Sequence, residues 1–196
     1  MSEAHIIETQ SLDFAEEILT TPDLVLRAPN KDDVADIARL ANNRNISSML
    51  GSMPYPYYEQ DAEQFVQKVS NPDAGSHVFA ITHIETGEFM GICGLHLEKR
   101  RFELPYIGYW LGEDYWGKGY ATQAARALVD LFFKTGSEDK MLVTVLSNND
   151  ASRRVIEKCG GQFWKRGMDH SAYFGKDMEV DHFQVTRENW MGTIAA

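Results

Sequence analysis

Residues 103–135 join a strand-like segment to an amphipathic helix through a short turn that contains two glycines, and this unit constrains the fold most strongly. Residues 103–111 are rich in Tyr, Ile and Trp, which suit the pleated, half-buried surface of a strand. Apolar residues then recur at helical spacing from residue 121 to residue 132, so one face of this segment can pack on a core. The pattern predicts a strand, a turn and a helix in succession.

The turn places glycine and lysine directly before the helix begins. Its sequence is Trp116-Gly117-Lys118-Gly119-Tyr120-Ala121-Thr122. The first turn of a helix leaves four N–H groups unpaired, and the helix dipole makes that end slightly positive. Glycine has no Cβ, so a ligand can approach the backbone closely. We therefore expect an anion site suited to phosphate groups here. The alternative is that the two glycines only turn the chain, because a short Gly-x-Gly signal is weak.

Composition narrows the class of protein. The sequence is 43% hydrophobic and 24% charged, which is normal for a globular protein. Its length of 196 residues is sufficient for one domain. A net charge of −10 argues against a non-specific nucleic-acid binder. The cysteines, Cys93 and Cys159, have no metal-ligand spacing and indicate a reducing compartment. Neither a signal peptide nor a membrane-spanning apolar run is visible. We expect a cytoplasmic protein with no membrane or nucleic-acid partner and no metal.

The segments before the turn predict strands and helices in an α/β arrangement. The expected elements are a strand at 24–27, a helix capped by Asn30 with Asp33 as the acid of a capping box, a loop over 42–57, a helix from about Glu59, and strands at 78–84 and 89–97. The short turn at 85–88 predicts an antiparallel hairpin. One α/β domain over residues 1–196 is expected, with its core at about 22–190 and an arm or short helix at 1–20.

The segments after the turn predict one more strand–helix unit and a final set of strands. A largely apolar strand is expected at 141–146, then a short helix capped at 147–150, ended by Gly160 and Gly161. Residues 163–186 contain strand-like pieces broken by a polar loop around Gly175-Lys176-Asp177. The whole pattern predicts a mixed sheet.

Ser152 shares one face of the short helix with Val155, Ile156 and Cys159. A hydroxyl group on an apolar face needs a hydrogen-bond partner. One interpretation is a bond to the backbone near the helix cap. The other is that Ser152 faces a cleft between two strands that separate, where open α/β sheets tend to place ligands.

The turn resembles the acetyl-CoA signature of the GNAT superfamily of N-acetyltransferases, Gln/Arg-x-x-Gly-x-Gly/Ala, with Trp116 at its first position. The wider pattern is similar to the RimJ/RimL-like branch over about residues 22–190. The supporting stretches are 24–29 (LVLRAP), 54–57 (PYPY), 87–94 (GEFMGICG), 107–111 (IGYWL), 116–122 (WGKGYAT) and 149–160 (NDASRRVIEKCG). The departures are Gln123, where the family often has Glu, and the displaced Phe163 after the last helix.

The resemblance implies a fold and an activity. The fold is a mixed, mostly antiparallel central sheet that is splayed in the middle and has helices on both faces. The activity is direct transfer of an acetyl group from acetyl-CoA to a primary amine, either a protein N-terminus or a small molecule, in a ternary complex. The protein would act as a monomer or a homodimer.

The resemblance also implies site residues. The turn would hold the pyrophosphate of acetyl-CoA, and the splayed strand near Leu111 would pair with the pantetheine arm and polarise the thioester carbonyl. The expected cofactor-binding residues are Tyr109, Trp110, Leu111, Trp116, Gly117, Lys118, Gly119, Tyr120, Ala121, Thr122, Asn149 and Ser152. Glu103 is the candidate general base, with His96 as a competing base, and Ser152 is the candidate donor to the leaving thiolate.

Two other function classes remain open. Gly117 and Gly119 also begin a dinucleotide-binding fingerprint, and Asp139 lies about the right distance further on. However, the third small residue would be Thr122, and Asp139 precedes its strand rather than ending it. A non-catalytic acyl-CoA-binding or regulatory module would keep the phosphate turn and lose the acid and the base.

Overall fold

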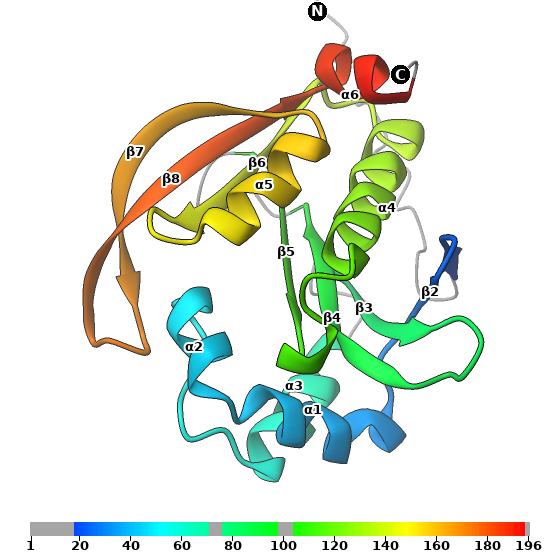
Figure 1. Ribbon diagram of the computed structural model, residues 1–196, viewed down its shortest axis with the longest axis vertical. Helices are drawn as coiled ribbons and strands as arrows, with labels where there is room; N and C mark the ends of the chain where they lie inside the picture. The colour runs from blue at the N-terminus through cyan, green and yellow to red at the C-terminus, as the bar shows by residue number, and fades with distance from the viewer. Residues whose placement is uncertain (1–17, 71–75, 98–103, 195–196) are drawn as a thin grey trace, which may run out of the picture.

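A sheet of eight strands organises the fold, with the strand order β1-β2-β3-β4-β5-β6-β8-β7 (Figure 1). The computed structural model describes residues 18–70, 76–97 and 104–194. The strands are β1 Leu19–Thr20, β2 Leu24–Arg27, β3 Ser76–His83, β4 Phe89–His96, β5 Tyr106–Leu111, β6 Lys140–Leu146, β7 Gly161–Ser171 and β8 Lys176–Thr186. Neighbouring strands are antiparallel except β5 and β6, which are parallel. The expected mixed, mostly antiparallel sheet is confirmed.

Helices cover both faces of this sheet. They are α1 Val34–Ala41, α2 Arg44–Leu50, α3 Glu59–Val69, α4 Tyr120–Thr135, α5 Asp150–Lys158 and α6 Arg187–Ile194. Phe79 and its successor Ala80 are both buried but belong to different apolar clusters. Phe79 packs in the cluster of α4, whereas Ala80 packs in the cluster of α1 and α3. Because successive strand residues point to opposite faces, α4 lies on one face and α1 and α3 lie on the other.

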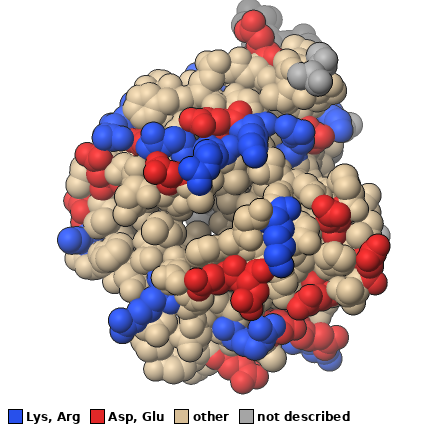
Figure 2. Space-filling view, viewed as in Figure 1, with Lys and Arg blue, Asp and Glu red and all other residues tan. Residues whose placement is uncertain are grey.

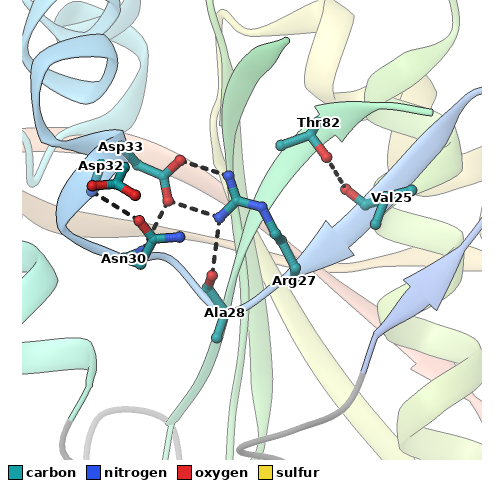
Figure 3. Close-up of polar contacts among 7 residues, drawn as sticks. All are labelled: Val25, Arg27, Ala28, Asn30, Asp32, Asp33 and Thr82. Atoms are coloured by element: carbon teal, nitrogen blue, oxygen red, sulfur yellow. Dashed lines mark hydrogen bonds and ion pairs between the residues drawn. The ribbon is translucent and has the colours of Figure 1, made fainter. Parts of the chain in front are cut away.

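A capping box fixes the start of the first helical segment, as the sequence predicts (Figure 3). The side chain of Asn30 accepts a hydrogen bond from Asp32 N (2.8 Å), and Asp33 accepts one from Asn30 N (2.8 Å). Arg27, at the end of β2, donates to both carboxylate oxygens of Asp33 at 2.6 and 2.8 Å. This bidentate pair joins the first long strand to the helical segment that follows it.

The segment 42–57 contains the helix α2, so the expected loop is wrong over Arg44–Leu50. The side chain of Asn43 accepts from Asn45 N and caps the helix. Glu113, far along the chain, accepts hydrogen bonds from the side-chain amides of Asn43 and Asn45 at 2.7 to 3.0 Å. A helix of this length depends on tertiary contacts rather than on propensity, so the local sequence does not reveal it.

The C-terminal part forms one long hairpin of β7 and β8 followed by α6. The turn between the strands spans residues 172–175, and residues 176 and 177 already belong to β8. The loop expected around residues 175–177 is therefore slightly too late in the chain. Neither β1 nor α6 is predicted from the sequence.

Candidate active site

The parallel strands β5 and β6 separate soon after they meet. Tyr106 and Leu142 are their single paired position in the described chain, and Leu142 N donates to Pro105 O at 2.8 Å. By contrast, β6 pairs with β8 along its whole length and β5 pairs with β4 along its own. The sheet therefore opens between the C-terminal halves of β5 and β6, which confirms the expected splay.

Two residues of β5 turn their backbone groups into this opening. Gly112 N donates to Met90 O of β4 at 2.9 Å. The hydrogen-bonded positions of an antiparallel pair alternate along the strand. The backbone groups of Trp110 therefore face β4, and those of Tyr109 and Leu111 face the gap. Because β6 offers no paired position here within the described chain, both N–H groups are available to a ligand.

The glycine turn lies between β5 and α4. Gly117 has φ = 75° and Gly119, the N-cap of α4, has φ = 85°, both in the left-handed region. No described atom lies within 4 Å of where a Cβ would stand on either glycine, so the turn is open to approach. Gly119 O accepts from Thr122 N and Gln123 N at 3.0 and 3.1 Å. In the described chain no acceptor pairs with the backbone N–H groups of residues 117–121, so the unpaired donors end one residue before Thr122.

Trp116 connects the turn to β5 through a side-chain hydrogen bond. Its indole Nε1–H donates to Leu111 O at 2.8 Å, while 44% of the residue remains exposed. The carbonyl of Leu111 is therefore already paired, although its N–H group is not. Lys118 is exposed, and its ammonium group lies 6.0 Å from the ring centre of Tyr115. No ion pair holds Lys118 among the described residues, so its charge can serve an anion.

Trp110 has a different environment from its neighbours in β5. Its ring lies edge-on to Phe89, with centres 6.4 Å apart, and packs against the apolar cluster of α1 and α3. Since its backbone groups also face β4, the expected contact of Trp110 with a cofactor stays a prediction.

The opposite wall of the opening is the start of α5. Asn149 caps this helix, because its side-chain oxygen accepts from Ser152 N at 3.0 Å. The hydroxyl oxygen of Ser152 lies 2.8 Å from that of Tyr109 on β5. The hydroxyl group of Ser152 on α5 therefore contacts a side chain of β5, and its role toward a ligand stays a prediction. Burial raises the pKa of the Tyr109 phenol, so it stays protonated at neutral pH.

Of the two candidate bases, only His96 lies among the described residues. Glu103 lies outside the described residues. His96, at the end of β4, has its Nδ1 2.7 Å from Ser76 Oγ, and its ring stacks on Tyr106 with centres 4.5 Å apart. A Cβ added to Gly94, the cross-strand partner of the exposed Gly108, would lie 3.1 Å from His96 Nε2. The imidazole therefore lies over the strand pair that leads to the opening.

Figure 2 shows a hollow near the middle of the face on which these elements meet. A band of mostly Lys and Arg side chains, with some Asp and Glu among them, runs above it, over the part of the surface that α5 and the adjoining part of α4 form in Figure 1. These helices carry the exposed residues Arg126, Arg154 and Lys158. A local basic surface on a chain of net charge −10 favours an anionic ligand at this place.

A second hollow of about 520 Å³ lies between α5, β7 and α6. Its lining residues are Glu157, Gly160, Gly161, Gln162, Glu188, Asn189 and Gly192. The lining has two carboxylates and no cation, so it would repel phosphate groups. None of the expected site residues contributes to it.

Gln123 connects the first turn of α4 to the N-terminal hairpin, which explains a departure from the family pattern. Its side-chain oxygen accepts from Thr21 Oγ1 (2.8 Å) and from Asp23 N (3.1 Å), and its amide nitrogen donates to the Asp23 carboxylate (2.6 Å). A glutamate would lack that donor and would face a second carboxylate.

We expect Gln123→Glu to lower the free energy of unfolding by about 1–2 kcal/mol at neutral pH. Thermal unfolding of the variant and the wild type at neutral pH measures it. A variant as stable as the wild type would show that the amide of Gln123 does not stabilise this contact.

Comparison with known proteins gives a consistent result. The family model described as an acetyltransferase (GNAT) domain matches residues 23–162. An uncharacterized N-acetyltransferase named p20 from Bacillus licheniformis is 24% identical over 180 residues, which is 90% of this chain and 99% of the relative. The solved structure of RimL, an alpha-N-protein acetyltransferase of ribosomal L7/L12, in complex with coenzyme A, has a TM-score of 0.75 at 20% identity. This similarity covers 87% of this chain and 98% of RimL.

A spermidine N-acetyltransferase from Vibrio cholerae, in complex with CoA and spermine, has a TM-score of 0.72 at 21% identity. The similarity covers 86% of this chain and 98% of that one. At this level of identity, the two solved structures support the architecture of the sheet and its helices.

Proposed function

Because the chain belongs to the GNAT family of acetyltransferases, we propose a mechanism in which its own residues bind acetyl-CoA and direct the acetyl group to a primary amine. The protein is an acetyl-CoA-dependent N-acetyltransferase. The observation that carries the mechanism is the opening between β5 and β6 after a single paired position, beside a helix start with unpaired N–H groups.

The phosphate end of acetyl-CoA is assigned to the turn. The unpaired N–H groups of residues 117–121 lie at the start of α4, where the dipole favours an anion. Lys118 adds a full positive charge. The N–H of Thr122 is already bound to Gly119 O, so this residue can contribute only its hydroxyl group. These groups fit a pyrophosphate in charge and in donor number.

The arm and the thioester are assigned to the opening. The N–H group of Tyr109 can donate to an amide carbonyl of the arm, as a neighbouring strand would. Asn149 lies on the opposite wall, with its side-chain oxygen used in the cap. Acetyl-CoA supplies the acetyl group as a thioester. The N–H of Leu111 is placed to stabilise negative charge on the carbonyl oxygen, and Ser152 is placed to donate to the departing sulfur.

A base must take the proton of the acceptor amine. We assign this role to Glu103, with His96 as the alternative. Glu103→Gln should lower kcat/KM about 10²-fold, with the largest loss at low pH, where the amine is hardest to deprotonate.

The pH profile of kcat/KM for Glu103→Gln and His96→Gln checks this assignment. His170→Gln serves as a control, because it removes an exposed histidine on β7 whose partner is Asp177. A profile for Glu103→Gln identical to that of the wild type would transfer the role to His96 or to water.

The acceptor is proposed to be a protein N-terminus or a small-molecule amine. RimL and the spermidine N-acetyltransferase are the two solved similar structures that motivate this pair of classes. Incubation with acetyl-CoA and a panel of N-terminal peptides and polyamines, read by thiol release and mass spectrometry, tests it. Acetylation of at least one amine is expected. Tight binding of acetyl-CoA with no product from any amine would favour the non-catalytic module.

We place the protein in the cytoplasm as a monomer or homodimer. Cys93 and Cys159 are both buried and unpaired, which suits a reducing compartment. No helix in the described part of the chain is long and apolar enough to cross a membrane. No group of metal-ligating side chains is found among the described residues.

A further inference from the structure

Tyr109 takes part in both walls of the opening. Its backbone belongs to β5 and faces the gap, and its hydroxyl group meets Ser152 on α5 at 2.8 Å. The phenol hydrogen has a second and longer acceptor in the backbone carbonyl oxygen of Ser152, at 3.4 Å. In the described chain β5 and β6 pair only at Tyr106 and Leu142. The contact between Tyr109 and Ser152 therefore connects β5 to the helix that follows β6, beyond the point where the two strands separate.

The two hydroxyl groups cannot both donate to each other. Each has one hydrogen, so one group donates and the other accepts. A phenol is ordinarily the stronger donor of the two, and Ser152 Oγ at 2.8 Å is a closer acceptor than Ser152 O at 3.4 Å, which favours donation from Tyr109 to Ser152 Oγ. In that arrangement the hydrogen of Ser152 is free to point elsewhere. The reverse arrangement would occupy the Ser152 hydrogen with the phenol oxygen.

The surroundings hold both groups in place. The ring of Tyr109 packs against the main apolar cluster of the sheet and α4. The backbone of Ser152 is fixed at the third position of α5 by the cap from Asn149. A hydrogen bond between two immobilised groups costs little conformational entropy, so it can keep one direction.

We propose that Tyr109 is a positioning residue that directs the hydroxyl hydrogen of Ser152 to the sulfur atom of CoA. This inference rests on the proposed role of Ser152. During transfer the amine nitrogen bonds to the acetyl carbon and the carbon–sulfur bond breaks. The electron pair stays on sulfur, and the amine proton passes to the base. Ser152 donates a hydrogen bond to the thiolate, Tyr109 donates to Ser152, and both keep their own protons.

The test uses CoA and desulfo-CoA, which lacks the thiol group, as probes. Titration calorimetry at about pH 7 and about pH 10 covers both sides of the ordinary thiol pKa. For the wild type, the ratio of the CoA affinity to the desulfo-CoA affinity should be about tenfold higher at about pH 10, where the thiol is ionised, than at about pH 7. Ser152→Ala should lose this gain, and Tyr109→Phe should lose most of it. The double variant should match Ser152→Ala, because Tyr109 acts through Ser152.

Desulfo-CoA distinguishes positioning from a structural role. Its affinity should be unchanged by Tyr109→Phe, whereas loss of a purely structural contact would weaken both ligands equally. Tyr115→Phe is the matched control, since it removes a tyrosine hydroxyl group bound to Glu88 instead. With an accepted amine, Tyr109→Phe should also lower kcat about tenfold without raising the Kd for acetyl-CoA.

The outcomes separate this inference from the proposed function. If Ser152→Ala loses the gain and Tyr109→Phe keeps it, the role of Ser152 stands and that of Tyr109 is overturned. If the losses of the two single variants add in the double variant, the two residues act independently and the inference is also overturned. If Ser152→Ala keeps the gain, the proposed role of Ser152 fails first.

Discussion

Gly119→Glu is expected to weaken acetyl-CoA binding by about 100-fold or more while the sheet and α4 stay folded. The new carboxylate would stand in the open space at the helix start and repel the pyrophosphate. Each hydrogen bond to a charged group contributes about 1.5–3 kcal/mol, and about 1.4 kcal/mol corresponds to a tenfold change in affinity. Losing one or two of these bonds therefore already accounts for a 100-fold loss. Titration calorimetry with acetyl-CoA measures it.

The matched control is Gly175→Glu. Gly175 lies in the turn between β7 and β8, has φ = 61°, and also has no described atom within 4 Å of where a Cβ would stand. The control therefore carries the same left-handed strain, about 1–2 kcal/mol, and the same added charge. Both variants should lose similar stability, and Gly175→Glu should bind acetyl-CoA like the wild type. Equal affinity in the two variants would remove the turn from the binding site.

Asp181→Ala is expected to lower the free energy of unfolding by about 2–3 kcal/mol. The side chain of Asp181 is 1% exposed and bonds to Arg153 of α5 (2.7 Å) and to Arg166 of β7 (2.7 Å). Removing one partner of a buried pair costs about 3–5 kcal/mol. The cost should be lower here, because the arginine side chains are 33% and 51% exposed and can turn to water. Differential scanning calorimetry should show a Tm lower by about 5–10 °C.

The same carboxylate gives a pH dependence of known sign. The hydrogen bond from Arg166 holds the pKa of Asp181 below its ordinary value. The unfolded chain therefore binds this proton more readily, and the stabilisation is present above about pH 4 and lost as pH falls through the folded pKa. The difference in the free energy of unfolding between the wild type and Asp181→Ala should become smaller at acidic pH. Asp177→Ala, which removes a 66% exposed partner of His170, should change stability by less than about 0.5 kcal/mol. A gap that persists in acid would contradict the ion-pair explanation.

Local chemistry allowed the sequence to predict the glycine turn and the elements on either side of it. Gly117 and Gly119 stand where a left-handed backbone is required, and Asn30 and Asn149 cap helices through contacts two or three residues away. Such short-range rules act within one turn of chain. The largely apolar run of β6 likewise follows from burial on both faces of the sheet.

Features that depend on distant partners were not predicted. Helix α2 is supported by Glu113, about seventy positions along the chain. Trp116 pairs with Leu111 O, which no spacing rule indicates. The partner of Ser152 is Tyr109, forty-three positions earlier. The one signal for it was a hydroxyl group on an apolar helix face, which shows that a partner is needed but not which one.

The most direct test of the proposed site is a titration of the isotopically labelled protein with acetyl-CoA, followed by the backbone amide signals in nuclear magnetic resonance spectra. The largest changes should fall on the amides of Tyr109 and Leu111 and of residues 117–122, with smaller ones at the start of α5. NAD, added as a control, should leave the amides of Tyr109 and Leu111 unchanged. Changes confined to the hollow between α5, β7 and α6, or none at all, would contradict the proposed site.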